Sequence, residues 1–253
     1  MSFLHPFLTD GSQSPQSVVQ VSESGTGVVA GGAHRVGTRG ALPDGRVFYY
    51  ARSSGAAIVA GKMNQMPDVP TTFTDLAVGT ELAGQSTLAV TPGAVTALED
   101  AFAGGYCIIQ DDTGEGQIFT VKSHLAVASA TEFTVNIEGT IPIALGAGAT
   151  VSMIKSPWAD VIISGAAQDH MCVGVSNVAV PAGTTNPQHF WCQTWGVAPV
   201  WQDEASANGS ALSSGTTAGQ VELADATSDQ IVGQLVVVAV DTEYTPTFLT
   251  IAP

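Results

Sequence analysis

Short runs of β-branched and aromatic residues, separated by Gly-rich turns, constrain the fold of this chain more than any other feature. Such runs recur roughly every ten residues from Gly45 onward, a spacing typical of sandwiches and barrels. Helical periodicity is confined to Ala94–Gly105, which is predicted to form a short helix ended by glycine. We therefore expect an all-β chain that forms a β-sandwich or a barrel, with a jelly roll as one form of it.

The stretch GYCIIQDDTGEGQIFTVKSH contains the clearest hairpin signal in the chain. Tyr106–Gln110 and Gln117–Val121 are rich in β-forming residues. The Asp-Asp-Thr-Gly-Glu-Gly between them supplies residues that tolerate a positive φ angle. We expect these two runs to pair as antiparallel strands.

Residues 1–45 differ from the rest of the chain, because they are rich in Gly and Ser and show no sustained periodicity. We expect an extended N-terminal arm here, with a disordered terminus as the alternative. Apolar side chains at the tip are expected to anchor the arm, and the arginines at its far end are expected to dock onto an acidic partner surface. The alternative is that these charges serve no specific contact. The docking candidates are Phe3, Leu4, Phe7, Leu8, Arg35, Arg39 and Arg46.

The distribution of basic residues suggests how the β-rich part is divided. All seven basic residues lie at or before Lys155, whereas residues 156–253 carry nine acidic side chains and no Lys or Arg. We expect a first β region over residues 46–155 and a second over 156–253, with the boundary near Ser156–Pro157. The alternative is that the two regions form one continuous β domain.

The charge and hydropathy of the chain restrict its partners. A net charge of −15 would repel nucleic-acid phosphates. Only 11% of the residues are charged, which suits a protein that buries much of its surface against copies of itself or another partner. The N-terminal stretch lacks the pattern of a signal peptide, and the longest apolar run, Leu235–Val240, is too short to span a bilayer. We therefore expect synthesis in a cytoplasm, with neither nucleic acid nor a membrane as a partner.

The segment HFWCQTWGVAPVW, His189–Trp201, holds three of the four tryptophans. In a strand, Phe190 and Cys192 point to one face and Trp191 to the other. His189 shares the face of Trp191, so it cannot easily form a nucleophile–base pair with Cys192. A free cysteine among tryptophans usually packs as a small hydrophobic residue.

Gly196 interrupts this segment and is expected to turn the chain before a second short strand over Pro199–Trp201. The segment is predicted to be a strand of the core or of a subunit interface. The residues expected to pack there are Phe190, Trp191, Trp195 and Trp201.

The sequence offers weak candidates for metal or catalytic chemistry. Cys107, Cys172 and Cys192 are too few and too scattered for a disulfide framework. His170 and Cys172 share a strand face, but the closely paired ligands of structural zinc are absent. The acidic turn 111–115 matches no EF-hand loop, and nothing places its carboxylates across a cleft as in a glycosidase. Without a nucleophile elbow, P-loop or dinucleotide fingerprint, we expect no catalytic residue, metal or cofactor, and no enzyme.

Four stretches carry a resemblance to a known group of proteins: LPDGRVFYYARSSGAAIVAGKM, GYCIIQDDTGEGQIFTVKSH, HFWCQTWGVAPV and IVGQLVVVAVDTEYTPTFLTIAP. In the order of the predicted strands and in their general residue pattern, residues 40–253 resemble virion structural proteins of tailed bacteriophages, in particular capsid cement (decoration) proteins. The resemblance implies a β-rich protein on the outside of an icosahedral head, assembled in the host cytoplasm. It also implies the major capsid protein as partner and homotrimers at local three-fold positions.

Two alternatives stay open. The chain could be a tail, neck or head-fibre component, which would be present in few copies per virion. It could instead be a carbohydrate-binding β-sandwich module that recognises host surface glycans through Trp191, Trp195 or Trp201. Exposed tryptophan side chains would favour the glycan-binding alternative, and buried ones would favour a core or an interface.

Overall fold

The computed structural model describes residues 5–6, 34–67, 71–167, 171–183, 187–226 and 229–253. Within these ranges strands dominate, and the one helical element is a short 3-10 turn, η1 (Thr71–Phe73). The expectation of an all-β chain is confirmed. The strands are β1 (His5–Pro6), β2 (Arg39–Ala41), β3 (Val47–Arg52), β4 (Met63–Gln65), β5 (Leu76–Val78), β6 (Thr87–Thr91), β7 (Tyr106–Ile109), β8 (Ile118–His124), β9 (Phe133–Ile137), β10 (Thr150–Ile154), β11 (Ile162–Ile163), β12 (Cys172–Ser176), β13 (His189–Trp201), β14 (Ala211–Ser214), β15 (Val221–Leu223), β16 (Gly233–Leu235) and β17 (Tyr244–Thr250).

The described chain forms two compact units, each with its own hydrophobic core. Unit 1 contains the described residues up to Pro67 and those from Pro157 to Pro253. Unit 2 contains the described residues from Thr71 to Ser156. In sequence, unit 2 is therefore an insertion between two parts of unit 1.

This division differs from the one expected from the sequence. Residues 46–67 belong to unit 1, because β4 pairs with β11 and β12, which follow the insertion. Strand β2 falls within the expected arm but pairs with β3, so it is part of the sheet of unit 1. The described residues between His34 and Gly45 are thus attached to a folded domain and do not form a free arm.

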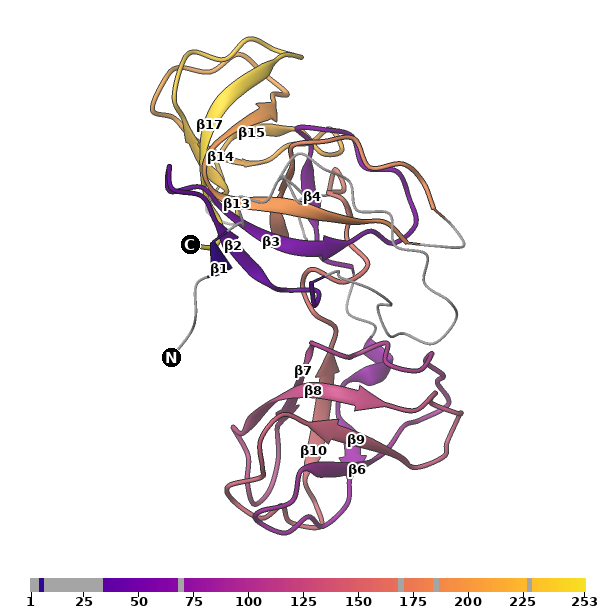
Figure 1. Ribbon diagram of the computed structural model, residues 1–253. Helices are drawn as coiled ribbons and strands as arrows, with labels where there is room; N and C mark the ends of the chain where they lie inside the picture. Colours follow the sequence, from indigo (N-terminus) through magenta and orange to yellow (C-terminus); the bar gives the residue numbers. More distant parts are fainter. Residues whose placement is uncertain (1–4, 7–33, 68–70, 168–170, 184–186, 227–228) are drawn as a thin grey trace. The chain divides into compact units, whose positions relative to one another are not determined.

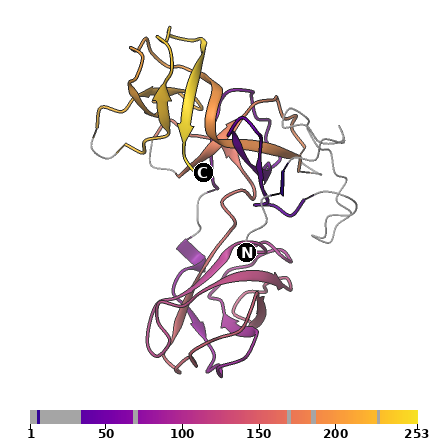
Figure 2. The same cartoon turned by 60° about the vertical axis from the view of Figure 1, so that its left-hand side comes forward.

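Unit 2 is a closed antiparallel barrel with the strand order β10-β5-β6-β9-β8-β7. Figures 1 and 2 show these strands wrapping around a common interior. The barrel closes where β10 pairs with β7, with Met153 opposite Cys107. Alternation along the strands turns side chains such as Leu88, Val90 and Val135 inward, where they are fully buried. A barrel of so few strands is filled by its own side chains.

The hairpin predicted from the acidic Gly-rich turn is confirmed, since β7 and β8 pair as antiparallel strands. The turn between them holds Asp112, Gly114 and Gly116 at φ angles of 63°, 93° and 81°. Glycine reaches these angles at little steric cost, which explains why this sequence can reverse so tightly.

The helix expected over Ala94–Gly105 is wrong. Ala97 instead forms an isolated bridge with Val127, and Asp100 adopts a φ angle of 57°, which no right-handed helix contains. Phe102 lies in the barrel core and is only 1% exposed. Packing of this segment against the barrel therefore overrides its modest helix propensity.

Unit 1 is built on a curled sheet whose main path runs β1-β2-β3-β13-β17-β16-β14-β15. Strand β12 adds to β13, and β4 joins β12 to β11. A parallel bridge between Gln202 and Val221 connects the end of β13 to the start of β15, so the sheet curls back on itself. The long strand β13 thus pairs with three strands of unit 1, β3, β12 and β17.

Several clusters of buried side chains stabilise unit 1. One lies inside the curl of the C-terminal strands and includes Leu249. A second includes Phe190 and Cys192 on one face of β13, and a third includes Tyr50 and Trp191 on the opposite face. The alternation expected for this strand is confirmed over these residues.

Candidate interaction surface

Strand β13 changes its neighbours halfway along its length. From His189 to Trp195 it pairs with β3, and at Cys192 and Gln193 it also pairs with β12. From Trp195 to Trp201 it pairs with β17. Strands therefore flank both edges of β13 at Cys192 and Gln193, and the side chains from His189 to Thr194 are buried on both faces. Beyond Trp195, Val197 and Pro199 are exposed on one face.

Gly196 lies where the neighbours change. Its φ angle is 84°, and a Cβ atom at this position would lie 2.9 Å from Cγ of Arg46. The register against β3 also shifts between Gln193 and Trp195, as in a β-bulge. The turn expected at Gly196 is wrong, because the residue bends the strand without ending it and pairing with β17 continues through Pro199.

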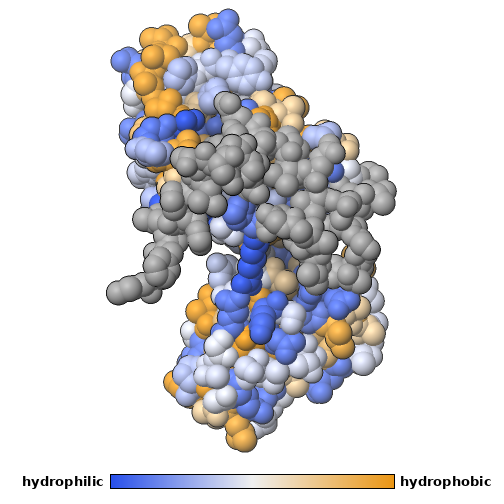
Figure 3. All heavy atoms as spheres, in the orientation of Figure 1, coloured by the Kyte–Doolittle hydropathy of each residue, from blue (hydrophilic) through white to orange (hydrophobic). Residues whose placement is uncertain are grey.

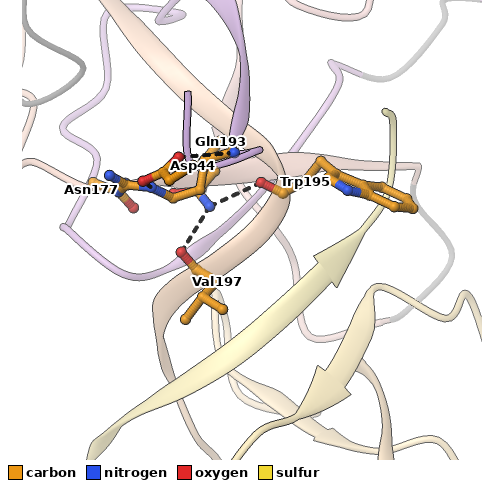
Figure 4. A network of polar contacts seen from close by, with 6 residues as sticks. Asp44, Asn177, Gln193, Trp195 and Val197 are labelled. Atoms are coloured by element: carbon orange, nitrogen blue, oxygen red, sulfur yellow. Dashed lines mark hydrogen bonds and ion pairs between the residues drawn. The ribbon is translucent and has the colours of Figure 1, made fainter. Parts of the chain in front are cut away.

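A buried side-chain amide holds the bend in place (Figure 4). Gln193 Nε2 donates to the carbonyl oxygens of Trp195 at 3.1 Å and of Val197 at 3.0 Å. Its Oε1 accepts a hydrogen bond from Nδ2 of Asn177 at 2.7 Å. Because one side chain binds carbonyls on both sides of Gly196, it fixes the direction in which the second half of β13 continues.

Beyond the bend, alternate side chains of β13 and β17 point away from the core and meet in register. Val197 lies opposite Phe248, and Pro199 lies opposite Pro246. Val197 is 46% exposed and Phe248 is 37% exposed, while the residues between these positions are buried. The solvent side of this pair of strands is therefore apolar at these positions, whereas Thr250, opposite Trp195, is an exposed polar residue.

Aromatic pairs lie at both ends of this row. Trp195 packs edge-to-face on Phe248 with ring centroids 5.7 Å apart, and Trp201 packs edge-to-face on Tyr244 at 4.6 Å. The hydroxyl of Tyr244 donates to the carbonyl oxygen of Ala60 at 3.0 Å. Edge-to-face packing is a favoured geometry for such rings, so they are held in fixed positions while part of each stays accessible.

The segment after the neighbouring strand continues the apolar surface, although the outward residue of β16 itself is the polar Gln234. Strand β16 pairs with β17, and the backbone N–H just after it, at Val236, donates to the carbonyl oxygen of Pro246 at 3.1 Å. Val236, Val237, Val238 and Val240 are 45%, 46%, 66% and 53% exposed. In Figure 3, hydrophobic residues gather at the part of unit 1 that Figure 1 draws in yellow. We call the following residues the apolar face: Trp195, Val197, Pro199, Trp201, Val236, Tyr244, Pro246 and Phe248.

From Tyr244 to Phe248, strand β17 shows the inverse of the usual amphipathic pattern, whereas at its end Leu249 is buried and Thr250 is exposed. Thr245 and Thr247 point inward and are 4% and 0% exposed, while Tyr244 and Phe248 point outward and are 48% and 37% exposed. The Thr247 hydroxyl, at 3.4 Å, accepts a hydrogen bond from Nε2 of Gln202, so it is satisfied inside. An antiparallel sheet with one face in water normally places polar residues outward. This pattern indicates that a binding partner covers the outer face of β17 when the protein functions.

No residue of the apolar face carries a charge. Two acidic side chains of unit 1 bind the loop between β14 and β15, whereas Asp241 and Glu243 are exposed just before Tyr244 in the sequence. Asp203 Oδ2 accepts from the backbone N–H of Thr217 at 2.9 Å, and Glu222 Oε2 accepts from that of Thr216 at 3.0 Å. Another acidic group, Asp160, is paired with Arg52 at 2.7 Å.

The four aromatic residues predicted to lie in a core or an interface divide between the two environments. Phe190 and Trp191 are 0% and 2% exposed and belong to the core. Trp195 and Trp201 are half-buried and belong to the apolar face. The residues of β17 that line the apolar face were not named individually from the sequence, although the alternation in YTPTFLT was visible. The pattern alone does not say that its threonines point inward.

The arginines expected to dock the arm make contacts within the chain. Arg39 Nε donates to the carbonyl oxygen of Pro253 at 3.1 Å, and Arg46 Nε pairs with Asp44 at 2.8 Å. Arg35 is exposed. Their docking role stays a prediction. The apolar docking candidates Phe3, Leu4, Phe7 and Leu8 lie outside the described residues.

All three thiols are buried. Burial raises the pKa of Cys107 and Cys192 to about 12, and it raises that of Cys172 to about 11 against an opposing hydrogen bond from Ser214. These thiols are therefore protonated at neutral pH and are poor nucleophiles in the folded chain.

His189 lies on the opposite face of β13 from Cys192. Its ring stacks on Tyr50 with centroids 5.4 Å apart. Burial, followed by the charge of Arg52, lowers the pKa of His189 to about 4. The imidazole is therefore neutral at physiological pH and packs as part of the aromatic cluster of unit 1.

Within the described ranges, no three His, Cys, Asp or Glu side chains form a group that could hold a metal ion. His170, which shares a strand face with Cys172 in the sequence pattern, lies outside those ranges. In the acidic turn, Asp112 Oδ2 accepts from the backbone N–H of Gly148 at 2.9 Å, and Asp111 Oδ2 accepts from the Thr150 hydroxyl at 3.0 Å. These carboxylates therefore hold a neighbouring loop of the barrel.

Unit 2 carries an open groove of about 580 Å³ at the bulge between β8 and β9. Its wall includes Lys122, Asn136 and Glu138, and Asn136 Nδ2 donates to the Ser123 hydroxyl at 3.0 Å. The groove has one basic and one acidic side chain and no aromatic residue in its lining. It is a weaker candidate for recognition than the apolar face.

Comparison with known proteins gives no relative: no family model, no curated protein and no solved structure matches the chain. Across the part of the chain that the structure describes, no helix is both long and apolar enough to cross a membrane. The apolar face is therefore the main guide to function.

Proposed function

We propose that this chain is a structural protein of a tailed-bacteriophage virion, and specifically a decoration protein that binds the outer surface of the head. There it would stabilise contacts between subunits of the major capsid protein. The observation that carries the proposal is the inverted pattern of β17 from Tyr244 to Phe248, where apolar side chains point outward and two threonines point inward. Contiguous apolar surface of this kind marks an interaction site, because assembly removes it from water.

The mechanism needs no chemical step. A decoration protein acts by adding contact area between neighbouring capsid subunits, and each contact can be weak because many copies act together. The chain suits this role because both units have closed, well-packed cores and the thiols are buried. The sequence resemblance to capsid cement proteins supports the same assignment.

Copy number in purified virions tests the proposal. Quantitative mass spectrometry would compare this chain with the major capsid protein of the same particles. Comparable copy numbers would support a decoration lattice over the head. A handful of copies per particle would instead favour a tail, neck or head-fibre component, and absence from the virion would overturn the assignment.

The partial exposure of Trp195, Trp201 and Tyr244 favours a second candidate function, which is binding of host surface glycans. Aromatic rings can stack on the apolar faces of sugars. Titration with host-derived polysaccharide would then change the tryptophan fluorescence, and Trp201→Ala would remove the change. A decoration protein would show no response to the polysaccharide.

A further inference from the structure

We infer that the groove at the bulge between β8 and β9 is a second binding site of this chain, and that it takes a neutral polyhydroxylated ligand such as a hexose unit of a saccharide. The site lies wholly within unit 2. The inference goes beyond the proposed function, because it needs neither the apolar face nor a capsid. The site also differs from the glycan-binding alternative, whose tryptophans all lie in unit 1.

A β-bulge aims a lysine at the groove. Strands β8 and β9 are neighbours in the barrel (Figure 1). Their register shifts between Val121 and Ser123, so Lys122 is an extra residue on β8 with no residue opposite it on β9. Bulges re-aim side chains and are common beside binding and active sites. Lys122 is exposed and lines the groove.

Hydrogen bonds within the barrel hold the wall of the groove. Asn136 Nδ2 donates to the Ser123 hydroxyl at 3.0 Å, which leaves Oδ1 of Asn136 to accept from a ligand. The backbone N–H of Ile137 donates to the carbonyl oxygen of Ser86 at 2.9 Å. The segment before β6 and the strands β8 and β9 are thus fixed around one space, so binding requires little ordering of the site.

The lining offers both donors and acceptors to a ligand. Lys122 and the hydroxyls of Ser86 and Ser123 can donate hydrogen bonds. Asn136 Oδ1 and the carboxylate of Glu138 can accept them. Across the described ranges, Lys122 forms no ion pair, so its ammonium group is available. Each hydroxyl of a sugar both donates and accepts, and it can therefore bind both kinds of group.

The charges of unit 2 select a neutral ligand. The lining carries one lysine and one glutamate, so its formal charges balance. Residues 71–156 contain nine acidic side chains and only two lysines, so the field of this unit repels an anion. A cation would be repelled by Lys122 at the groove itself. A neutral polyhydroxylated ligand avoids both penalties.

The size of the groove fits a small ligand. Its volume of about 580 Å³ lies within the roughly 300–1,000 Å³ typical of small-molecule sites. The lining contains no aromatic ring on which a sugar could stack, so hydrogen bonds alone must hold the ligand. We therefore expect weak binding, with a Kd on the order of 1 mM for a single hexose. Several copies acting together would bind a polysaccharide more tightly.

Saturation-transfer NMR of the purified full-length chain tests the inference, because it detects weak binding. The probes are glucose, galactose and mannose as neutral hexoses, with glucuronate and inorganic phosphate as anions. At least one hexose should receive saturation from the protein, and neither anion should bind more tightly. Lys122→Met and Glu138→Ala should each weaken binding about 10-fold, because each removes a charge-assisted hydrogen bond. Lys155→Met replaces the other lysine of unit 2, outside the groove, and should leave binding unchanged.

Three results would overturn the inference. No saturation of any of the three hexoses would show that the groove is not a saccharide site. Tighter binding of glucuronate or phosphate would make it an anion site at Lys122. Hexose binding that survives both Lys122→Met and Glu138→Ala would place the sugar elsewhere on the chain. Circular dichroism of both variants separates loss of binding from loss of fold. None of these results bears on copy number in virions, so failure of this inference and failure of the proposed function can be told apart.

Discussion

The two halves of β13 differ in what their hydrophobic side chains do. In the first half, Phe190 and Trp191 are 0% and 2% exposed, and they stabilise opposite sides of the sheet of unit 1. In the second half, Ala198 and Val200 are buried in a core on the inner face, but Val197 on the outer face is 46% exposed and belongs to no core cluster. Folding of a single chain accounts for the buried residues of both halves and leaves the outward apolar residues of the second half unexplained. This difference is the reason to assign the second half to an interaction.

The largest expected effect is a difference in unfolding free energy between a substitution in the buried first half of β13 and one on the apolar face. Phe190→Ala should lower the unfolding free energy of unit 1 by about 3–5 kcal/mol, because it leaves a cavity in a closed core. Phe248→Ala, on the apolar face, should lower it by only about 1 kcal/mol. All four tryptophans lie in unit 1, so urea unfolding followed by tryptophan fluorescence reports on this unit alone. Equal losses of unfolding free energy from the two substitutions would show that the apolar face stabilises the fold as much as the core does.

The next effect concerns pH and the first half of β13. The folded-state pKa of His189 is about 4, below its ordinary 6.5, so folding favours the neutral ring. Stability is therefore full above pH 6.5 and falls as the pH drops toward 4, because only the unfolded chain takes up the proton. The loss from this group is on the order of 3 kcal/mol.

Urea unfolding of wild type and His189→Gln at several pH values checks this expectation. The variant lacks the titrating ring, so its stability should depend less steeply on pH across the same window. Parallel pH profiles for the two proteins would show that another group causes the loss.

A smaller effect should arise at the bend between the halves. Gly196→Ala forces an L-residue to a φ angle of 84° and brings its Cβ to within 2.9 Å of Arg46 Cγ, which should cost about 2 kcal/mol. Gly209→Ala is the matched control, because Gly209 has a similar φ angle of 79° but open space around it. Denaturation midpoints should therefore fall further for Gly196→Ala than for Gly209→Ala. Identical midpoints would mean that the contact with Arg46 does not matter.

The smallest effect on stability is expected on the apolar face itself. Val197→Thr keeps the β-branched shape, so the unfolding free energy should change by no more than about 0.5 kcal/mol. Incorporation into virions should still weaken, because the variant buries a hydroxyl at the contact. Thermal unfolding of the purified variant and its copy number in purified virions measure the two quantities. A large loss of stability would assign Val197 to the fold.

Some of this structure was predictable because its determinants are local. The turn sequence between Tyr106 and His124 needs residues that tolerate positive φ, and it specifies the hairpin by itself. The opposite orientation of Phe190 and Trp191 follows from the two-residue period of a strand. The sequence also singled out Trp195 and Trp201, although it did not separate them from the buried pair.

Other features depend on contacts far apart in sequence. The segment around Phe102 has helical periodicity, but the bridge between Ala97 and Val127 and the burial of Phe102 decide its conformation. The insertion of unit 2 leaves no mark at residue 67, because β4 finds its partners only after the insertion. The bend at Gly196 likewise depends on Gln193 and its distant partner Asn177.

Hydroxyl-radical footprinting of the free chain and of the assembled particle tests the account most directly. Trp195, Tyr244 and Phe248 are accessible in the single chain and are expected to be strongly protected in the assembly, whereas Trp191 should be labelled weakly in both states. Labelling of the three apolar-face residues that stays the same in the two states would contradict the claim that this face is an interaction surface.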